Sequence, residues 1–134
     1  MAPKLLLDTH VAVRWLADPR KLSRNQARIL ATAVRRAEPV ALSAITLLEI
    51  AVFTADGRLR LKAPMDELLA ELQANPAFQL LPLSYEVVSE VASLGGVLRD
   101  PADRTIVATA RVHRLRLMTS DQRIVESKLV PVVD

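Results

Sequence analysis

The sequence predicts an α/β fold in which a parallel sheet is covered by helices on both sides. Leu5 to Leu7 form an apolar run without alternation, which is typical of a strand buried on both faces of a parallel sheet. Similar short apolar runs alternate with segments of helical periodicity along the chain. With 134 residues, 51% of them hydrophobic, the chain is expected to form one domain, residues 1–134, with two or three packed layers.

The first half of the chain contains two strand-then-helix units. In order, the expected elements are a strand at 4–7, helices at 11–17 and between Ser23 and Pro39, a strand at 40–42, a helix at 44–55 and a short extended edge at 58–62. Ser23 and Ser43 precede the two longer helices, and serine is a favoured N-cap. The helix at 44–55 is apolar on nearly every side, which predicts burial. The basic and apolar alternation at 58–62 is typical of a charged sheet edge.

The second half of the chain repeats this pattern. In order, the expected elements are a helix between Pro64 and Pro76, a strand at 78–83, a helix at 85–94, a long helix from Pro101, a strand at 114–121 that runs into an acid at its end, a brief helix at 122–127 and an extended run at 129–133. Pro64 and Pro101 suit a helix start, because a proline there removes only an N–H that lacks an intrahelical partner. The alternation as a whole predicts a parallel sheet between two helical layers.

The composition excludes several classes of site and partner. Cysteine is absent and there are only two histidines, so neither a disulfide framework nor a thiolate or imidazole-rich zinc site is expected, and any metal would be held by oxygen. No apolar run approaches the roughly 20 residues that cross a bilayer, which predicts a soluble, cytoplasmic protein without a membrane partner. The net charge of +3, carried mostly by arginine, gives slight support for a nucleic-acid partner.

Four acidic residues interrupt patterns that otherwise face the core. Asp8 and Asp121 each follow a predicted strand. Glu49 lies in the middle of an apolar helix, where an ionised side chain needs a cationic partner. Asp103 shares a helix face with the core-facing Val107. In an open α/β sheet, strand ends and the first turns of the following helices share one edge, so the four carboxylates are expected to converge in one pocket.

Such a pocket predicts a site for a hard metal ion. Crowded carboxylates repel one another unless a multivalent cation neutralises them. Oxygen ligands without histidine or cysteine favour Mg²⁺ or Mn²⁺, and these ions serve phosphate chemistry. Each acid also has a structural alternative, namely a helix cap at Asp8 or Thr9, a buried ion pair at Glu49, a contact with the helix dipole at Asp103 and a turn at Asp121.

The four acids lie in segments that carry a resemblance. These segments are Leu5 to His10 with Trp15, Ser43 to Glu49, Arg99 to Arg104 followed by Ile106 to Ala110, and Thr119 to Asp121. Together they resemble the PIN-domain ribonucleases, and in particular the VapC-like toxins of bacterial type II toxin–antitoxin modules. The resemblance spans essentially the whole chain. It implies a three-layer α/β/α sandwich with a central, mainly parallel sheet.

The resemblance also implies a metal-dependent endoribonuclease that cleaves RNA phosphodiester bonds. By the same resemblance, Asp8 and Asp103 are the principal ligands of Mg²⁺ or Mn²⁺. Glu49 and Asp121 complete the catalytic and metal-binding pocket, directly or through water.

Three further residues are candidates for supporting roles. Thr9 and Ser120 resemble the small hydroxyl residues that position such acids, with helix capping as the alternative for each. Asp100 is a supporting candidate, although an i,i+4 ion pair with Arg104 is the favoured interpretation. One departure concerns Leu98, which stands where many relatives with the same opening motif carry a histidine. No acid is lost by this change, so it bears on substrate preference more than on activity.

The implied partners are RNA, an antitoxin encoded alongside, and a second copy of the chain. An acidic pocket attracts arginine or lysine as readily as a metal, so we expect the antitoxin to cover it with a cationic side chain. Trp15 and residues 58–62 are hard to place in one small core, which favours a homodimer, with Trp15 as an ordinary core residue as the alternative.

The principal alternative function is a non-catalytic PIN-fold binding module whose acids are structural and paired with arginines. A haloacid-dehalogenase-like phosphatase is disfavoured, because it needs a second aspartate where this chain has His10. A response-regulator receiver is disfavoured as well, because the late lysine, Lys128, follows the wrong element.

Overall fold

Five parallel strands form one central sheet in the order β3-β2-β1-β4-β5. The computed structural model describes residues 2–134. The strands are β1 (Leu5–Leu7), β2 (Val40–Ser43), β3 (Phe78–Leu81), β4 (Arg116–Met118) and β5 (Val132–Val133). In the central strand, Leu6 lies opposite Ala41 of β2 and Leu117 of β4. All four strand pairs are parallel, which confirms the predicted α/β class.

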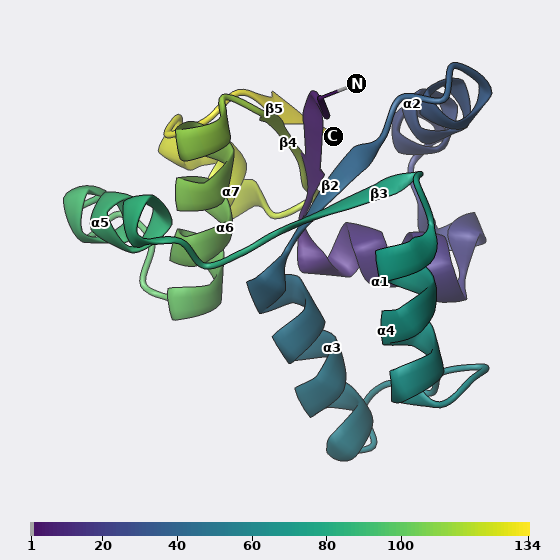
Figure 1. Ribbon diagram of the computed structural model, residues 1–134. Coiled ribbons are helices and arrows are strands. Elements are labelled where there is room, and N and C mark those ends of the chain that lie inside the picture. The colour runs from purple at the N-terminus through teal and green to yellow at the C-terminus, as the bar shows by residue number, and fades with distance from the viewer. Residues whose placement is uncertain (1) are drawn as a thin grey trace.

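Helices cover both faces of this sheet (Figure 1). They are α1 (Thr9–Ala17), the short 3₁₀ helix η1 (Pro19–Lys21), α2 (Arg24–Arg35), α3 (Ala44–Ala55), α4 (Met65–Ala74), α5 (Tyr85–Ser93), α6 (Pro101–His113) and α7 (Gln122–Ser127). Helices α5, α6 and α7 lie on one side, and α1, α2 and α4 on the other. The fold is therefore the three-layer α/β/α sandwich that the resemblance implies.

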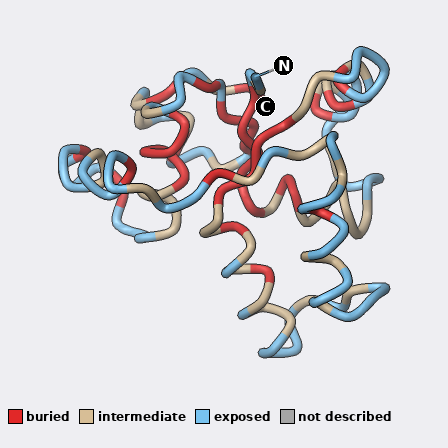
Figure 2. The backbone as a smooth tube through the Cα atoms, viewed as in Figure 1, coloured by how far each residue is buried: buried red, intermediate tan, exposed pale blue. Residues whose placement is uncertain are grey.

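The two halves of the core meet at the central strand. Leu6 packs with the residues of α5, α6 and α7, while Leu5 and Leu7 pack with those of α1, α2 and α4. The middle of the sheet is correspondingly the most buried part of the backbone (Figure 2). Trp15 belongs to the second half, where its ring lies 5.5 Å from that of Phe78. The alternative view of Trp15 as an ordinary core residue is therefore correct.

The predicted burial of the helix at 44–55 is wrong. Only Thr46 and Ile50 of α3 are buried, while Leu48 and Val52 are 56% and 44% exposed. The helix continues from β2 and extends beyond the sheet, so the sheet covers only part of it (Figure 1). Apolar composition alone predicts burial without indicating how far the neighbouring layer reaches.

The expected extended edge at residues 58–62 is also absent from the sheet. The backbone N–H groups of Arg58 and Leu59 donate to the carbonyl of Phe53, and the Arg58 guanidinium lies 5.5 Å from the centre of the Phe53 ring. The segment thus folds back onto the end of α3, and these N–H groups are not available to a neighbouring strand.

Several element boundaries also differ from the predictions by a few residues. Helix α1 begins at Thr9, because Asp8 caps it. Strand β4 begins only at Arg116, because Arg114 ends α6 in the left-handed conformation, and it ends at Met118, before the residues that lead to the N-cap of α7. Strand β5 is confined to Val132–Val133. Within residues 2–134, no helix combines the length and the apolar character needed to cross a membrane.

Short connections place helix starts at the carboxyl edge of the sheet. A single residue, Asp8, separates β1 from α1, and β2 runs directly into α3 through the N-cap Ser43. Three residues, Thr119 to Asp121, separate β4 from α7. The side chains of Asp8 and Asp121 both accept hydrogen bonds as N-caps, which confirms the capping role predicted for Asp8 and gives Asp121 a capping role where a turn was the predicted alternative. The same connections bring both acids to one edge.

Candidate active site

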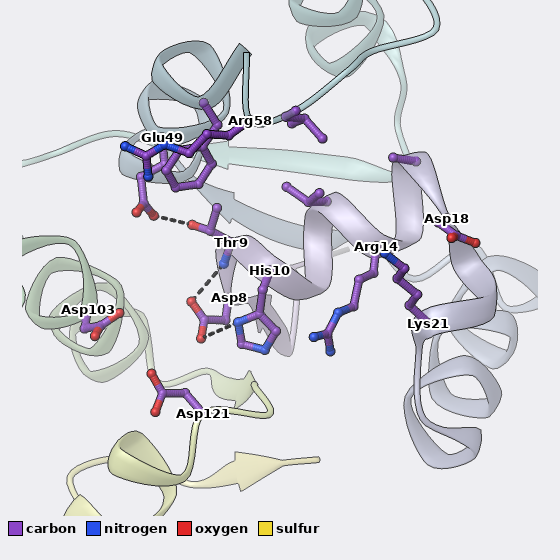
Figure 3. A pocket seen from close by; sticks show the side chains of 14 residues that line it. Asp8, Thr9, His10, Arg14, Asp18, Lys21, Glu49, Arg58, Asp103 and Asp121 are labelled. Atoms are coloured by element: carbon purple, nitrogen blue, oxygen red, sulfur yellow. Dashed lines mark hydrogen bonds and ion pairs between the residues drawn. The ribbon is translucent and has the colours of Figure 1, made fainter. Parts of the chain in front are cut away.

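An open pocket of about 540 Å³ is lined by all four acids that interrupt the core pattern (Figure 3). Asp8 lies between β1 and α1, Glu49 lies on α3, Asp103 on the first turn of α6, and Asp121 before α7. Thr9 and His10 also line this pocket, whereas Asp100 and Ser120 are not among its lining residues.

Asp8 is buried and held from three sides. Its Oδ1 accepts a hydrogen bond from the Thr9 amide at 2.8 Å. Its Oδ2 accepts from the Thr119 hydroxyl at 2.6 Å and lies 3.3 Å from His10 Nδ1. Because the His10 Nε2 accepts from the Ser120 amide at 2.9 Å, the hydrogen-bond network assigns the proton of a neutral His10 to Nδ1, facing Asp8. The orientation of the Asp8 carboxylate is thereby fixed.

Thr119 links two of the acids and was not singled out from the sequence as a supporting residue. Its hydroxyl donates to Asp8 and accepts from the backbone N–H of Asp121 at 3.0 Å. Its neighbour Ser120 has a different role, since the Ser120 hydroxyl accepts from the buried Gln26 of α2 at 2.9 Å. The signal in the sequence was a Thr-Ser-Asp triplet after a strand, which did not indicate which hydroxyl faces the acids.

Glu49 is bonded to a hydroxyl, and the expected cationic partner is absent from residues 2–134. The Thr9 hydroxyl donates to Glu49 Oε1 at 2.5 Å and lies 3.0 Å from the hydroxyl of Thr46. Burial raises the pKa of Glu49, the Thr9 hydrogen bond opposes this, and the charges of Asp100 and Asp8 add to the rise. The prediction of an ion pair overlooked that a helix on the pocket rim is only partly desolvated.

Asp103 is the most perturbed carboxyl group of the pocket. Burial, together with the negative charges of Asp100, Asp8 and Asp121, raises its pKa to about 6, and Arg123 opposes this rise. The acids therefore lie close enough to sense one another. This is the electrostatic situation that a divalent cation relieves.

Asp100 caps α6 and does not pair with Arg104. Its Oδ1 accepts from the backbone N–H groups of Ala102 and Asp103 at 2.8 and 3.3 Å. The Arg104 side chain instead donates to the Val91 carbonyl at 3.1 Å. The favoured i,i+4 interpretation is therefore wrong, because the free amides of the first turn compete for the Asp100 carboxylate.

Asp121 is neutralised by an arginine that was not identified from the sequence. Arg123 Nη2 lies 2.9 Å from Asp121 Oδ2, and Arg123 Nε donates to Oδ1 at 3.2 Å. The same Nη2 lies 3.7 Å from Asp103 Oδ2. The hydrogen bond from Arg123 lowers the pKa of Asp121 against the opposing effect of burial. The i,i+2 spacing of Asp121 and Arg123 was the available signal.

The remainder of the pocket is mainly basic and apolar. Arg14, Lys21 and Arg58 line it together with Val13 and Phe53, and with one further acid, Asp18. In Figure 3, Arg14 and Lys21 lie on the far side of His10 from Asp103 and Asp121. The pocket therefore has an acidic end and, at Arg14, Lys21 and Asp18, a basic end with a net positive charge, which suits a metal ion beside a polyanion.

The acids do not form a ready-made metal cage. Among residues 2–134, no three histidine, aspartate or glutamate side chains are close enough together to hold one ion. The donor set is nevertheless oxygen-only, and Mg²⁺ is commonly held by one or two carboxylates plus water and substrate phosphates. The donor chemistry therefore fits such an ion.

Leu98, the residue at which the sequence departs from the resemblance, is a buried core residue.

Known proteins resemble this chain over nearly its full length. A PIN domain family model matches residues 5–128. Ribonuclease VapC22 of Mycobacterium tuberculosis is 33% identical over 121 residues, covering 90% of this chain and 88% of that protein. The structure of FitAcB from Neisseria gonorrhoeae is 28% identical, with a TM-score of 0.71 and coverage of 97% of this chain and 96% of that chain. DNA-bound VapBC from Salmonella typhimurium shares the fold at 16% identity, with a TM-score of 0.72 and coverage of 99% and 98%. The chain belongs to the PIN-domain family.

Proposed function

We propose that this chain is the toxin of a type II toxin–antitoxin pair and acts as an Mg²⁺- or Mn²⁺-dependent endoribonuclease. The observation that carries the proposal is the meeting of four carboxylates, from separate parts of the chain, at one open pocket. The likeness to Ribonuclease VapC22 supports RNA as the substrate class.

The alternative of a non-catalytic binding module with structural acids is less consistent with Asp103. A structural carboxylate inside a protein is normally paired, because an unpaired buried charge is costly. The only ion-pair contact of Asp103 within residues 2–134 is the 3.7 Å contact with Arg123, and its pKa is raised to about 6. An acid kept at this electrostatic cost favours a binding or catalytic role.

We assign Asp8 and Asp103 as the principal metal ligands, with Glu49 and Asp121 acting directly or through water. A divalent ion bound there supplies Lewis acidity for phosphodiester cleavage and offsets the charge that develops on the leaving oxygen. Thr119 and His10 hold the Asp8 carboxylate in one orientation. Thr9 joins this group to Glu49, so hydrogen bonds within the protein orient two of the four carboxylates before an ion is bound.

Removal of divalent metal is the direct test of the proposed reaction. We expect the purified protein to cleave RNA with millimolar Mn²⁺ or Mg²⁺ and to lose this activity in EDTA, because the carboxylates alone offer no Lewis acid. Gel analysis of end-labelled RNA measures the cleavage, and restoring Mn²⁺ after EDTA controls for irreversible damage. RNA binding with no cleavage under any metal condition would support the non-catalytic alternative.

We propose that the basic end of the pocket holds RNA phosphates next to the cleaved one. The logarithm of the association constant for RNA falls linearly with the logarithm of the salt concentration. Arg14→Gln and Lys21→Gln are each expected to make this slope less steep by about 0.7 to 1, because each removes one phosphate contact. Fluorescence anisotropy with a short RNA in EDTA measures the slope.

A second basic cluster provides the control for this salt dependence. Arg28 and Arg36 line another pocket, together with Lys4 and Arg116. Arg28→Gln and Arg36→Gln change the net charge by the same amount and should leave the slope unchanged. Equal slopes for all four variants and the parent would contradict this position for the RNA.

We further propose two protein partners, an antitoxin and a second copy of the chain. The open acidic pocket attracts a cationic antitoxin side chain as readily as a metal ion. For the homodimer, the support comes from the exposed apolar residues of α3 and α5, namely Leu48, Val52, Tyr85 and Val88, and not from the partly buried Trp15.

A further inference from the structure

We propose that Arg123 is an internal counter-ion that competes with the divalent cation for Asp121 and Asp103, and that once displaced it binds the RNA phosphate. This inference rests on the proposed metal-dependent nuclease. It assigns a function to a residue that lies beside the acidic pocket and contributes no metal ligand of its own.

The contacts of Arg123 are the first support. Its guanidinium engages both oxygens of Asp121, through Nε at 3.2 Å from Oδ1 and Nη2 at 2.9 Å from Oδ2. Such a planar two-point contact is the strong form of an arginine–carboxylate pair. The same Nη2 lies 3.7 Å from Asp103 Oδ2, so one cationic group faces two carboxylates from different elements.

The second support is that this arrangement is specific. Among the described residues, Arg123 is the one lysine or arginine within ion-pair distance of any of the four pocket acids. It therefore supplies positive charge to the acids of α6 and of the β4–α7 connection, which is the charge that a bound divalent ion would supply. A divalent ion must overcome this charge to reach Asp121 and Asp103.

The third support is that Arg123 can be displaced. Its side chain is 75% exposed, whereas those of Asp103 and Asp121 are each 19% exposed. Water and salt screen an ion pair at this exposed position even in its two-point form, so a divalent ion bound by the two less exposed acids can replace the guanidinium. The freed group remains at the pocket rim, where its planar fork matches a phosphate.

Two measurements with opposite expected signs test the proposal. Arg123→Gln should lower the dissociation constant for Mn²⁺, measured by electron paramagnetic resonance of free Mn²⁺, by about 3- to 10-fold, since a competing charge is gone. The same variant should raise the KM for a short RNA at saturating Mn²⁺ by about 10-fold, since a phosphate contact is lost. Arg123→Lys keeps the charge without the fork and should fall between the parent and Arg123→Gln in both measurements.

Arg20→Gln is the matched control. Arg20 forms an i,i+2 ion pair with Asp18, with Nε 3.2 Å from Oδ1, and is not in contact with the four acids. This variant changes the net charge as Arg123→Gln does and should alter neither Mn²⁺ affinity nor KM. Equal changes in both variants would assign the effect to overall charge and overturn the proposal.

The outcomes separate this proposal from the one on which it rests. If the parent binds Mn²⁺ and Arg123→Gln binds it equally or more weakly, the competition is overturned while the metal site stands. If Mn²⁺ binds more tightly but KM is unchanged, the phosphate contact is overturned. A parent that binds no Mn²⁺ overturns the metal site itself, and the competition with it.

Discussion

Asp103→Asn is expected to reduce RNA cleavage by at least about 100-fold while leaving the protein as stable as the parent or more so. Changes in residues that merely support a metal ligand cost 10- to 100-fold, so loss of a ligand should cost no less. Stability should hold because burial and neighbouring negative charges disfavour the ionised form of Asp103. Cleavage of end-labelled RNA in Mn²⁺ and thermal melts in EDTA measure the two effects.

Asp8→Asn should lose activity to a similar extent but should also lose stability, by about 1 to 3 kcal/mol. The Asp8 carboxylate accepts from the Thr9 amide and the Thr119 hydroxyl. An amide group would direct N–H toward one of these donors. The two variants therefore distinguish Asp8, whose carboxylate is fixed by hydrogen bonds, from Asp103, whose ionised form is disfavoured by burial and by neighbouring acids.

Asp66→Asn is a suitable control, because Asp66 is an exposed acid in the first turn of α4. It should change neither cleavage nor melting temperature appreciably. An Asp103→Asn variant that cleaves RNA normally and melts as early as Asp8→Asn would show that these acids are structural.

The stability of the metal-free protein is expected to fall as pH rises from about 4 to 6. Burial and like charges raise the pKa of Asp103 from 3.8 to about 6, so in this window the folded state holds a proton that the unfolded state has lost. The stabilising contribution is therefore fully present below about pH 4 and lost as pH rises through about 6. The raised pKa of Glu49 acts in the same direction. Asp121, with a lowered pKa, acts oppositely and only at lower pH.

The Asp103 contribution is about 1 to 2 kcal/mol after allowance for solvent screening, or about 4 to 7 °C in melting temperature. Thermal melts in EDTA at several pH values measure it, and Asp103→Asn should flatten the profile. Mn²⁺ at pH 7 should raise the melting temperature of the parent more than that of Asp103→Asn, because a ligand stabilises only the state that binds it. A flat parent profile without a response to Mn²⁺ would contradict the picture of crowded carboxylates.

The sequence predicted what depends on local patterns. The Leu5 to Leu7 run and the serine caps specify elements over a few residues, and the parallel sheet follows from their alternation. The positions of Asp8 and Asp121 after strands were also sufficient to place both at one edge. In each case neighbouring residues contain the necessary information.

The contacts that tune the pocket were not predictable in this way. Thr119 donates to Asp8 across 111 positions of sequence, and Thr9 reaches Glu49 across 40. Their pairing depends on the register of β1 against β4 and on the crossing of α1 and α3. The exposure of α3 was missed for a related reason, since periodicity describes a helix and says nothing of how far its neighbours extend.

The central position of β1 has a consequence for synthesis of the protein. This strand is made first, yet one of its two neighbours is β4, near residue 117, whose following residues provide Thr119 and Asp121. A contact between residues so far apart in the sequence forms late in folding. A partly synthesised chain on the ribosome therefore lacks β4, Asp121 and Thr119, one of the three residues that orient Asp8, so the pocket is assembled only after most of the chain has emerged.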